Sequence, residues 1–431
     1  MQAPTRLAAP VIRATGAVMR GSGDLPVSCA LAPEDSIMTR QAPAPDAAAL
    51  AHSEQLLSLI RGQIRASGGV ISFARYMELA LYAPGLGYYS AGSRKFGAEG
   101  DFVTSPELGP TFAGCIAQAA AQVFAQLGGA ADFFEIGGGS GAFAEAALRH
   151  WQAIDALPAR YLILEPSADL RERQQARLAQ ALAPDVFARV AWLNGPPEAQ
   201  WRGVLFANEV LDALPTPRFV MRGGEVFEEY VALDPGGALI RVEQPADALL
   251  HAAVRHVERD VGAPFAEGYR SELLPQLPYW IQAVGGLLVD GAMLFVDYGY
   301  PRREYYLPER SDGTLVCHYR HHAHGNPFHL PGLTDITAFV DFTALAEAGV
   351  GAGFDFAGYC AQASFLINCG LPERLAEIEA IGDPVERHHR NNEVKRLTLP
   401  GEMGERFQAM AFQRGVDIRP VFARGDLGRR L

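Results

Sequence analysis

The chain has 431 residues, enough for one large domain with insertions or for two domains. Hydrophobic residues make up 49% and charged residues 20%, and no apolar run is long enough to span a bilayer, which is typical of a soluble globular protein and argues against membrane insertion. The net charge of −12 argues against general nucleic-acid binding, because no basic surplus is available to neutralise phosphates. The five cysteines form no CxxC pair, which suits a reducing compartment.

The first 45 residues differ from the rest of the chain. They are rich in Ala, Pro and Arg and contain no acid before Asp24, as in a transit peptide, but they lack a clean amphipathic face. We expect residues 1–45 to be a disordered extension, or an over-extended reading frame with Met38 as the true start. The high Ala, Gly and Arg content is typical of a GC-rich bacterial source, so we expect the protein to be located in the cytoplasm. A location in the mitochondrial matrix is expected only if residues 1–45 are a transit peptide.

Helices and a long loop precede the first predicted core strand. Apolar residues at helical spacing predict helices over Ser53–Ile64, Ser72–Tyr82 and Phe112–Leu127. Between the last two lies a glycine-rich, aromatic segment, residues 83–109, which is too polar for a core and too long for a simple connection. Such loops are often functional.

A glycine-rich turn follows the predicted strand Phe133–Ile136. The sequence Glu135-Ile-Gly-Gly-Gly-Ser-Gly141 places Glu135 at the strand end and glycines at 137, 139 and 141, before an alanine-rich helix. Gly137, Gly139 and Ala142 also satisfy the dinucleotide pattern Gly-x-Gly-x-x-Gly/Ala. A carboxylate at position 135 would repel a pyrophosphate, whereas it suits the cationic end of S-adenosylmethionine (SAM). The pattern therefore favours SAM over a nicotinamide dinucleotide and over a turn without a ligand.

The next strand, predicted from Tyr161, ends in Glu165. An acid at the end of the second strand can accept both ribose hydroxyls of an adenosine. This feature supports a nucleoside ligand but does not distinguish SAM from NAD. Without the glycine turn upstream, Glu165 would be interpreted as a solvated loop acid.

Further strands alternate with helices, and this predicts a parallel, doubly wound sheet. We expect a helix over Ala168–Leu182 and strands over Val186–Asn194, Gly203–Glu209 and Ala292–Gly299, with a last strand over Arg406–Gln413. Turn signals within Phe219–Val242 predict an antiparallel insertion instead of another strand–helix unit.

Three polar residues, Asn208, Glu209 and Asp212, follow the fourth strand. In open α/β sheets, chemistry occurs beyond the carboxyl ends of the strands, so they should lie near the transferred methyl group. Carboxylates are suited to orient a guanidinium through charge-assisted hydrogen bonds. The alternative is structural: Asp212 caps the next turn and Glu209 supports the fold.

Five histidines gather in residues 318–329. They include no helical His-x-x-x-His pair backed by a carboxylate, and Gly and Pro interrupt the segment. We therefore predict no metal site, and a polar loop near the substrate in which His322 or His324 could take a proton.

Taken together, these segments resemble the MidA family. The resemblance covers roughly residues 55–415 and rests on eight motifs: GYYS (87–90), GDFVTSPE (100–107), EIGGGSG (135–141), NEVLDALP (208–215), VDYG (296–299), RHHAHGNPF (320–328), DITAFVDF (335–342) and MGERF (403–407). It implies an α/β, Rossmann-like class I methyltransferase core with a doubly wound, mostly parallel sheet, a helical N-terminal cap and an α+β insertion. It also implies SAM as cofactor, bound by Glu135, Gly137, Gly139, Gly141 and Glu165. The family's mitochondrial member is a complex I assembly factor that methylates arginine.

We predict a domain arrangement and a reaction from these features. The expected segments are an extension (1–45), a helical cap with the loop (46–128), a SAM-binding core (129–218 and 287–415), an insertion on the substrate side (219–286) and a tail (416–431). The predicted function is methyl transfer from SAM to a protein side chain, with arginine as the acceptor and a respiratory complex I subunit as a possible partner. The alternatives are a small-molecule methyltransferase and a non-catalytic assembly factor.

Overall fold

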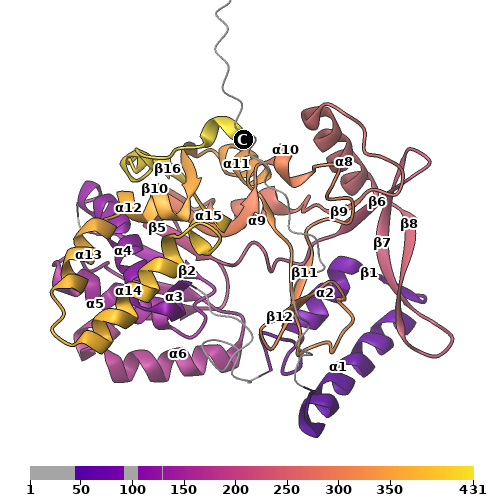
Figure 1. The fold of residues 1–431 in the computed structure, drawn as a ribbon, viewed down its shortest axis with the longest axis horizontal. Coiled ribbons are helices and arrows are strands. Elements are labelled where there is room, and N and C mark those ends of the chain that lie inside the picture. Colours follow the sequence, from indigo (N-terminus) through magenta and orange to yellow (C-terminus); the bar gives the residue numbers. More distant parts are fainter. Residues whose placement is uncertain (1–43, 92–104, 129) are drawn as a thin grey trace, which may run out of the picture. The chain divides into compact units, whose positions relative to one another are not determined.

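The core of the fold is one mixed sheet. The computed structural model describes residues 44–91, 105–128 and 130–431. In this part of the chain the core strands lie in the order β15-β16-β10-β5-β2-β3-β4, and β14 pairs with β10. Figure 1 labels four of these strands, β2, β5, β10 and β16. Their bounds are β2 (Asp132–Ile136), β3 (Tyr161–Leu164), β4 (Val190–Leu193), β5 (Trp201–Asn208), β10 (Leu288–Tyr300), β14 (Val340–Asp341), β15 (Asp355–Ala361) and β16 (Phe407–Arg414). Among these eight strands, only β16 is reversed, which confirms the predicted mostly parallel sheet.

The strand order reverses between β2 and β5. The chain runs from β2 outward to β3 and β4, then returns to place β5 on the other side of β2. Ile136 pairs with Ala207, so the glycine turn and Asn208 leave the sheet at the same level. This reversal is the point at which doubly wound sheets bind ligands.

Helices cover both faces of the core sheet, because apolar side chains along its strands point alternately to one face and to the other. On β2, Phe133 packs into one apolar cluster and Phe134 into the other, and β5 divides Phe206 and Leu205 in the same way. The first cluster is closed by α4 (Pro110–Gln126), α5 (Ala142–Ala153), α6 (Ala168–Ala181), α12 (Gln362–Asn368), α13 (Leu371–Glu379) and α14 (Pro384–Thr398). The second is closed by α9 (Leu277–Gly285) and α11 (Phe342–Gly351).

A second, antiparallel sheet contains the predicted insertion. It has the order β1-β7-β6-β9, with β8 paired to β7: β1 (Val70–Ser72), β6 (Arg218–Arg222), β7 (Glu225–Leu233), β8 (Leu239–Pro245) and β9 (Arg270–Glu272). The antiparallel strands expected over Phe219–Val242 are confirmed. The sheet also joins distant segments, since Val70 of β1 pairs with Ala232 of β7. The helices beside it are α1 (Ala47–Ala66), α2 (Phe73–Tyr82) and α8 (Ala248–Val261).

The remaining elements among the described residues are short. A small sheet is formed by β11 (Val316–Tyr319), β12 (His322–His324) and β13 (Asp335–Thr337). The short helices are α3 (Ser105–Leu108), α7 (Pro184–Phe187), α10 (Arg302–Tyr305) and α15 (Met403–Arg406), with 3₁₀ turns at Arg419–Phe422 and Gly428–Arg430. None of the described helices is long and apolar enough to cross a membrane.

Two local predictions were wrong. The strand expected over Val186–Asn194 begins only at Val190, because Pro184 occupies the first turn of the short helix α7. The polar loop expected over residues 318–329 begins instead as the β11–β12 hairpin. Its two turn residues, Arg320 and His321, have φ of 47° and 64°, the left-handed conformation that a two-residue hairpin needs and that glycine or asparagine usually supplies.

Candidate active site

The glycine turn after β2 leaves open space at the end of the sheet. Gly137, Gly139 and Gly141 have φ of 73°, 53° and 80°, a region that other residues enter only with strain. A Cβ atom added to Gly139 would meet no heavy atom within 4 Å. Helix α5 starts at Ala142, and its N-cap residue Gly141 makes no side-chain cap. The turn and the helix start therefore offer space and a positive helix end to a ligand.

Two buried acids lie beside this turn. Glu135 is 3% exposed and accepts a hydrogen bond of 2.7 Å from the hydroxyl of Tyr161. Burial raises the pKa of Glu135 to about 8, and the negative charge of Glu165 adds to this, whereas Tyr161 opposes it. Burial likewise raises the pKa of Glu165 to about 7, against hydrogen bonds from Ser167 and Gln174. Both carboxyl groups thus gain from a cation or hydrogen-bond donor brought near them.

Gln174 of α6 was not predicted as a site residue, but it connects the glycine turn with Glu165. Its amide nitrogen donates to the carbonyl oxygen of Gly139 at 2.9 Å and to Glu165 at 3.4 Å. Its amide oxygen accepts from the indole of Trp192 at 2.8 Å. The fully buried Gln174 side chain therefore holds the glycine turn next to Glu165.

The predicted acceptor residues lie where β5 ends. Asn208 donates to Glu209 at 3.0 Å, and Glu209 itself has a φ of 53°, a strained value for a non-glycine residue. Burial raises the pKa of Glu209 to about 8, with the charge of Asp212 as the next cause. Burial also raises the pKa of Asp212 to about 6, although Tyr298 and nearby backbone amides lower it.

Two acceptor atoms at this strand end have no hydrogen-bond partner among the described residues. They are Oδ1 of Asn208 and Oδ1 of Asp212, and both are shielded from solvent. Buried polar atoms are normally satisfied, so two unsatisfied acceptors on residues four positions apart in one turn mark a place for a hydrogen-bond donor. The strained backbone of Glu209 at the same turn is also typical of functional sites.

Asp297, at the end of β10, organises this turn and was missed as a site residue. One of its carboxylate oxygens accepts from the amides of Val210, Leu211 and Asp212 at 3.2, 3.0 and 3.4 Å. The sequence contained a signal, because the VDYG motif places this acid directly after the apolar run of the predicted strand Ala292–Gly299, and β10 is the parallel neighbour of β5. Burial, followed by the charges of Asp212 and Glu209, raises the pKa of Asp297 well above its usual range.

The residues predicted to bind the cofactor and those predicted to bind the acceptor lie next to each other. A Cβ atom on Gly137 would lie 3.0 Å from Val210, so the glycine turn touches the β5 turn. The segment before α4 contacts both, because the Ser105 amide donates to Glu209 at 3.4 Å and Glu107 accepts from Ser140. These are the last residues of the GDFVTSPE motif, whose positions 100–104 lie outside the described residues, as do residues 1–43.

Aromatic residues of the GYYS segment lie next to the same acids. The ring of Tyr89 stacks on Tyr82 with centroids 5.5 Å apart, and its hydroxyl donates to Asp335 at 3.1 Å. The Tyr82 hydroxyl donates to the carbonyl of Ala213 at 2.9 Å. Burial, then the charges of Asp212, Asp335 and Glu165, raise the pKa of Tyr82, so its hydroxyl lies near all three acids.

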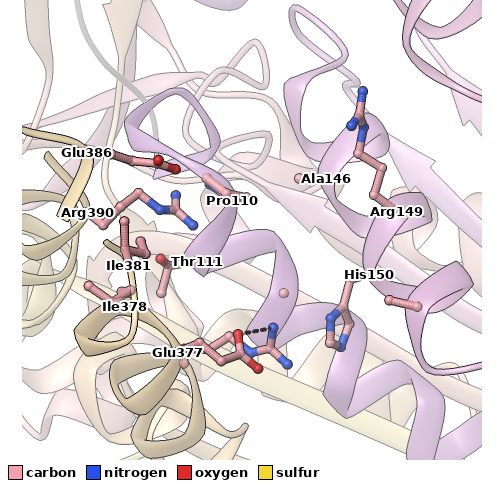
Figure 2. A pocket seen from close by; sticks show the side chains of 13 residues that line it. Pro110, Thr111, Ala146, Arg149, His150, Glu377, Ile378, Ile381, Glu386 and Arg390 are labelled. Carbon is pink, nitrogen blue, oxygen red and sulfur yellow. Dashed lines mark hydrogen bonds and ion pairs between the residues drawn. The ribbon is translucent and has the colours of Figure 1, made fainter. Parts of the chain in front are cut away.

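A separate hollow of about 380 Å³ lies between α4, α5, α13 and α14 (Figure 2). None of the predicted site residues lines it, and two of its arginines already have partners: Arg374 donates to Glu377 at 2.9 Å and Arg390 to Glu393 at 2.7 Å. The structure therefore gives this hollow no part in the site. Within the described residues, no group of three or more His, Cys, Asp or Glu side chains is arranged to hold a metal ion.

The reversed strand order, the glycine turn after β2 and the acids at the ends of β2, β3 and β5 define a class I methyltransferase fold. Comparison with known proteins agrees. Residues 115–360 match the family model described as “Putative S-adenosyl-L-methionine-dependent methyltransferase”. The chain belongs to this family, and it is a SAM-dependent methyltransferase.

Related proteins match over most of the chain. A crystal structure of a “likely methyl transferase” from Burkholderia thailandensis bound to S-adenosyl-homocysteine is 42% identical, with a TM-score of 0.83, over 91% of this chain and 100% of that one. “Protein arginine methyltransferase NDUFAF7, mitochondrial” of Danio rerio is 29% identical over 83% of this chain and 86% of its own length. The Homo sapiens protein of the same name is 27% identical over 80% of each.

Proposed function

We propose that this methyltransferase acts on the guanidinium group of an arginine in a protein. The observation that carries the proposal is the pair of buried acceptor atoms without partners, Oδ1 of Asn208 and Oδ1 of Asp212, beside the acid Glu209. A guanidinium presents five N–H donors in a planar fork and no acceptor, which is the complement of such a site. The relatives from Danio rerio and Homo sapiens are named as protein arginine methyltransferases, which supports the same acceptor.

The cofactor residues divide their work in this proposal. The open space at Gly139 and the start of α5 receive the cofactor, Glu165 accepts hydrogen bonds from its ribose, and Glu135 balances its positive charge. Gly137 and Gly141 let the backbone turn around it. When bound, SAM supplies an electrophilic methyl carbon on a sulfonium.

The acceptor residues position the nucleophile and remove its proton. Asn208 and Asp212 accept N–H groups of the guanidinium, which directs one nitrogen toward the methyl carbon. As this nitrogen forms its bond to carbon and the carbon–sulfur bond breaks, the N–H proton passes to a carboxylate. Burial raises the pKa of Glu209 to about 8, so this group must first lose its own proton when the guanidinium arrives; the resulting carboxylate is basic enough to take the N–H proton and is our choice for the acceptor.

The test is to identify the methylated product. Purified protein and methyl-labelled SAM are incubated with an extract of the source cells from which the gene has been deleted, and labelled proteins are hydrolysed to amino acids. We expect label in methylated arginine, and none with Gly139→Val. Label in the small-molecule fraction, or in another amino acid, would overturn the proposal in favour of a different acceptor.

The family resemblance makes a subunit of respiratory complex I the first acceptor to examine. The named relatives are mitochondrial, whereas we place this chain in the bacterial cytoplasm on the basis of its composition.

A further inference from the structure

Tyr298 holds one oxygen of Asp212 and leaves the other without a partner. Its hydroxyl donates to Oδ2 of Asp212 at 2.5 Å, and Oδ1 of the same carboxyl group has no hydrogen bond among the described residues. The tyrosine ring is fixed by edge contacts with Phe339 and Phe407, whose centroids lie 5.0 and 5.4 Å away. The direction in which Tyr298 donates is therefore set by packing.

The preceding residue fixes the backbone of the same turn. Asp297 accepts from the amides of residues 210 to 212 through one oxygen, and through the other from the amide of Tyr298 at 2.9 Å. Two consecutive residues of β10 thus control Asp212, one through its main chain and one through its side chain.

We infer that Tyr298 is a positioning residue for methyl transfer: it orients the Asp212 carboxylate so that Oδ1 remains for the acceptor group. This inference rests on the proposed function for the identity of the acceptor, whereas the hold of Tyr298 on Asp212 does not depend on it.

The hydroxyl of Tyr298 affects the charge of the Asp212 carboxyl group, because other acids surround that group. Glu209 at the end of β5, Asp297 on β10 and Asp335 on β13 are acids of the same cluster, and Tyr82 of α2 lies among them. Burial raises the pKa of Asp212, and the hydrogen bond from Tyr298 is the first of the influences that lower it. Thr337 in turn hydrogen-bonds the side chain of Tyr298. Removal of the Tyr298 hydroxyl should therefore protonate Asp212 at a higher pH.

The direct test compares Tyr298→Phe with Tyr300→Phe. Tyr300 lies two residues further along β10 and also packs on Phe339, with centroids 5.5 Å apart, so it is a matched control. The ionisation of Asp212 is followed by ¹³C NMR in protein labelled at the aspartate carboxyl carbon, and its resonance is assigned by its loss in Asp212→Asn. We expect Tyr298→Phe to raise the midpoint by about one to two pH units, the usual effect of a hydrogen bond to a charged group. An unchanged midpoint, or an equal rise in the control, would overturn the inference.

Activity supplies a second readout. The acid limb of the pH profile of kcat should move upward in Tyr298→Phe, and this effect should disappear in the Asp212→Asn background. An equal effect in both backgrounds would mean that Tyr298 does not act through Asp212. If Tyr298→Phe fails to fold, 3,5-difluorotyrosine at position 298 strengthens the donor and should lower the Asp212 midpoint; no change would overturn the inference. Because the titration needs no acceptor, a shifted midpoint without arginine methylation would refute only the proposed function.

Discussion

Replacement of Gly139 by alanine separates the strain of the backbone from the loss of the ligand site. Gly139 has a φ of 53°, and Gly223, in the turn between β6 and β7, has a φ of 57°. A Cβ atom at either position would meet no heavy atom within 4 Å. An L-residue in the left-handed region costs about 1–2 kcal/mol, so both substitutions should lower the free energy of unfolding by the same amount. Gly223→Ala is therefore a control for the strain alone.

Only the substitution at Gly139 should weaken SAM binding. Its methyl group would occupy the open space in which the cofactor meets the turn, and the cofactor would be displaced from one or two hydrogen bonds. At about 1–1.5 kcal/mol each, the loss corresponds to an increase of roughly 5- to 150-fold in Kd. The larger and β-branched side chain of Gly139→Val should abolish binding.

Calorimetric titration with SAM and thermal unfolding of the free proteins provide the two measurements. We expect both alanine variants to unfold at similarly reduced temperatures and only Gly139→Ala to bind SAM more weakly. If Gly139→Ala bound SAM as tightly as Gly223→Ala does, the cofactor would not lie at this turn, and the assignment of the glycines to the cofactor would fail.

Three further predictions concern the acids. Glu209→Gln should lower kcat by about a hundredfold or more while the Kd for SAM stays nearly unchanged, and equal activity in a methyl-transfer assay would remove Glu209 from the mechanism. Because burial raises the pKa of Glu135 from 4.5 to about 8, the folded ligand-free protein holds a proton that the unfolded chain loses, so stability should fall as pH rises from 5.5 to 8.5. The melting temperature of Glu135→Gln should depend less on pH, and an unchanged dependence would contradict this sign. Binding of the cationic SAM at pH 7.5 should release protons from Glu135 and Glu165, detectable by calorimetry in buffers of different ionisation enthalpy; proton uptake would refute it.

Elements with a strong local pattern could be predicted from the sequence. The apolar run before Glu135 needs a buried strand, and three alternating glycines after it need a turn that only glycine makes easily, so both the strand and the turn followed directly. The helix before the loop was also predicted from its local apolar pattern, and in the structure Ser72 caps α2 by accepting from the amide of Arg75.

Features that depend on distant residues could not be predicted. Gln174 on α6 looks like a surface residue in a polar helix, and only the sheet order brings its amide to Gly139 and Glu165. Asp297 was visible as a strand-end acid, but its hydrogen bonds to three amides of the β5 turn require that β10 lie beside β5. The hairpin turn at Arg320 and His321 lacks the usual glycine, so tertiary packing overrides the local preference there.

The unfavourable burial of so many acids in the free protein has a purpose if the enzyme joins two cations. A sulfonium and a guanidinium repel each other, and a site without compensating charge would bind the second only weakly after the first. Here Glu135 and Glu165 lie beside the glycine turn and Glu209 and Asp212 lie at the proposed acceptor site, and burial raises the pKa of all four. Each cation that enters can therefore expel a proton from its nearest acids and leave the total charge of the site almost unchanged. The same argument explains why Tyr298 matters: Asp212 has the lowest pKa of the four, so it is the acid already ionised when the guanidinium arrives.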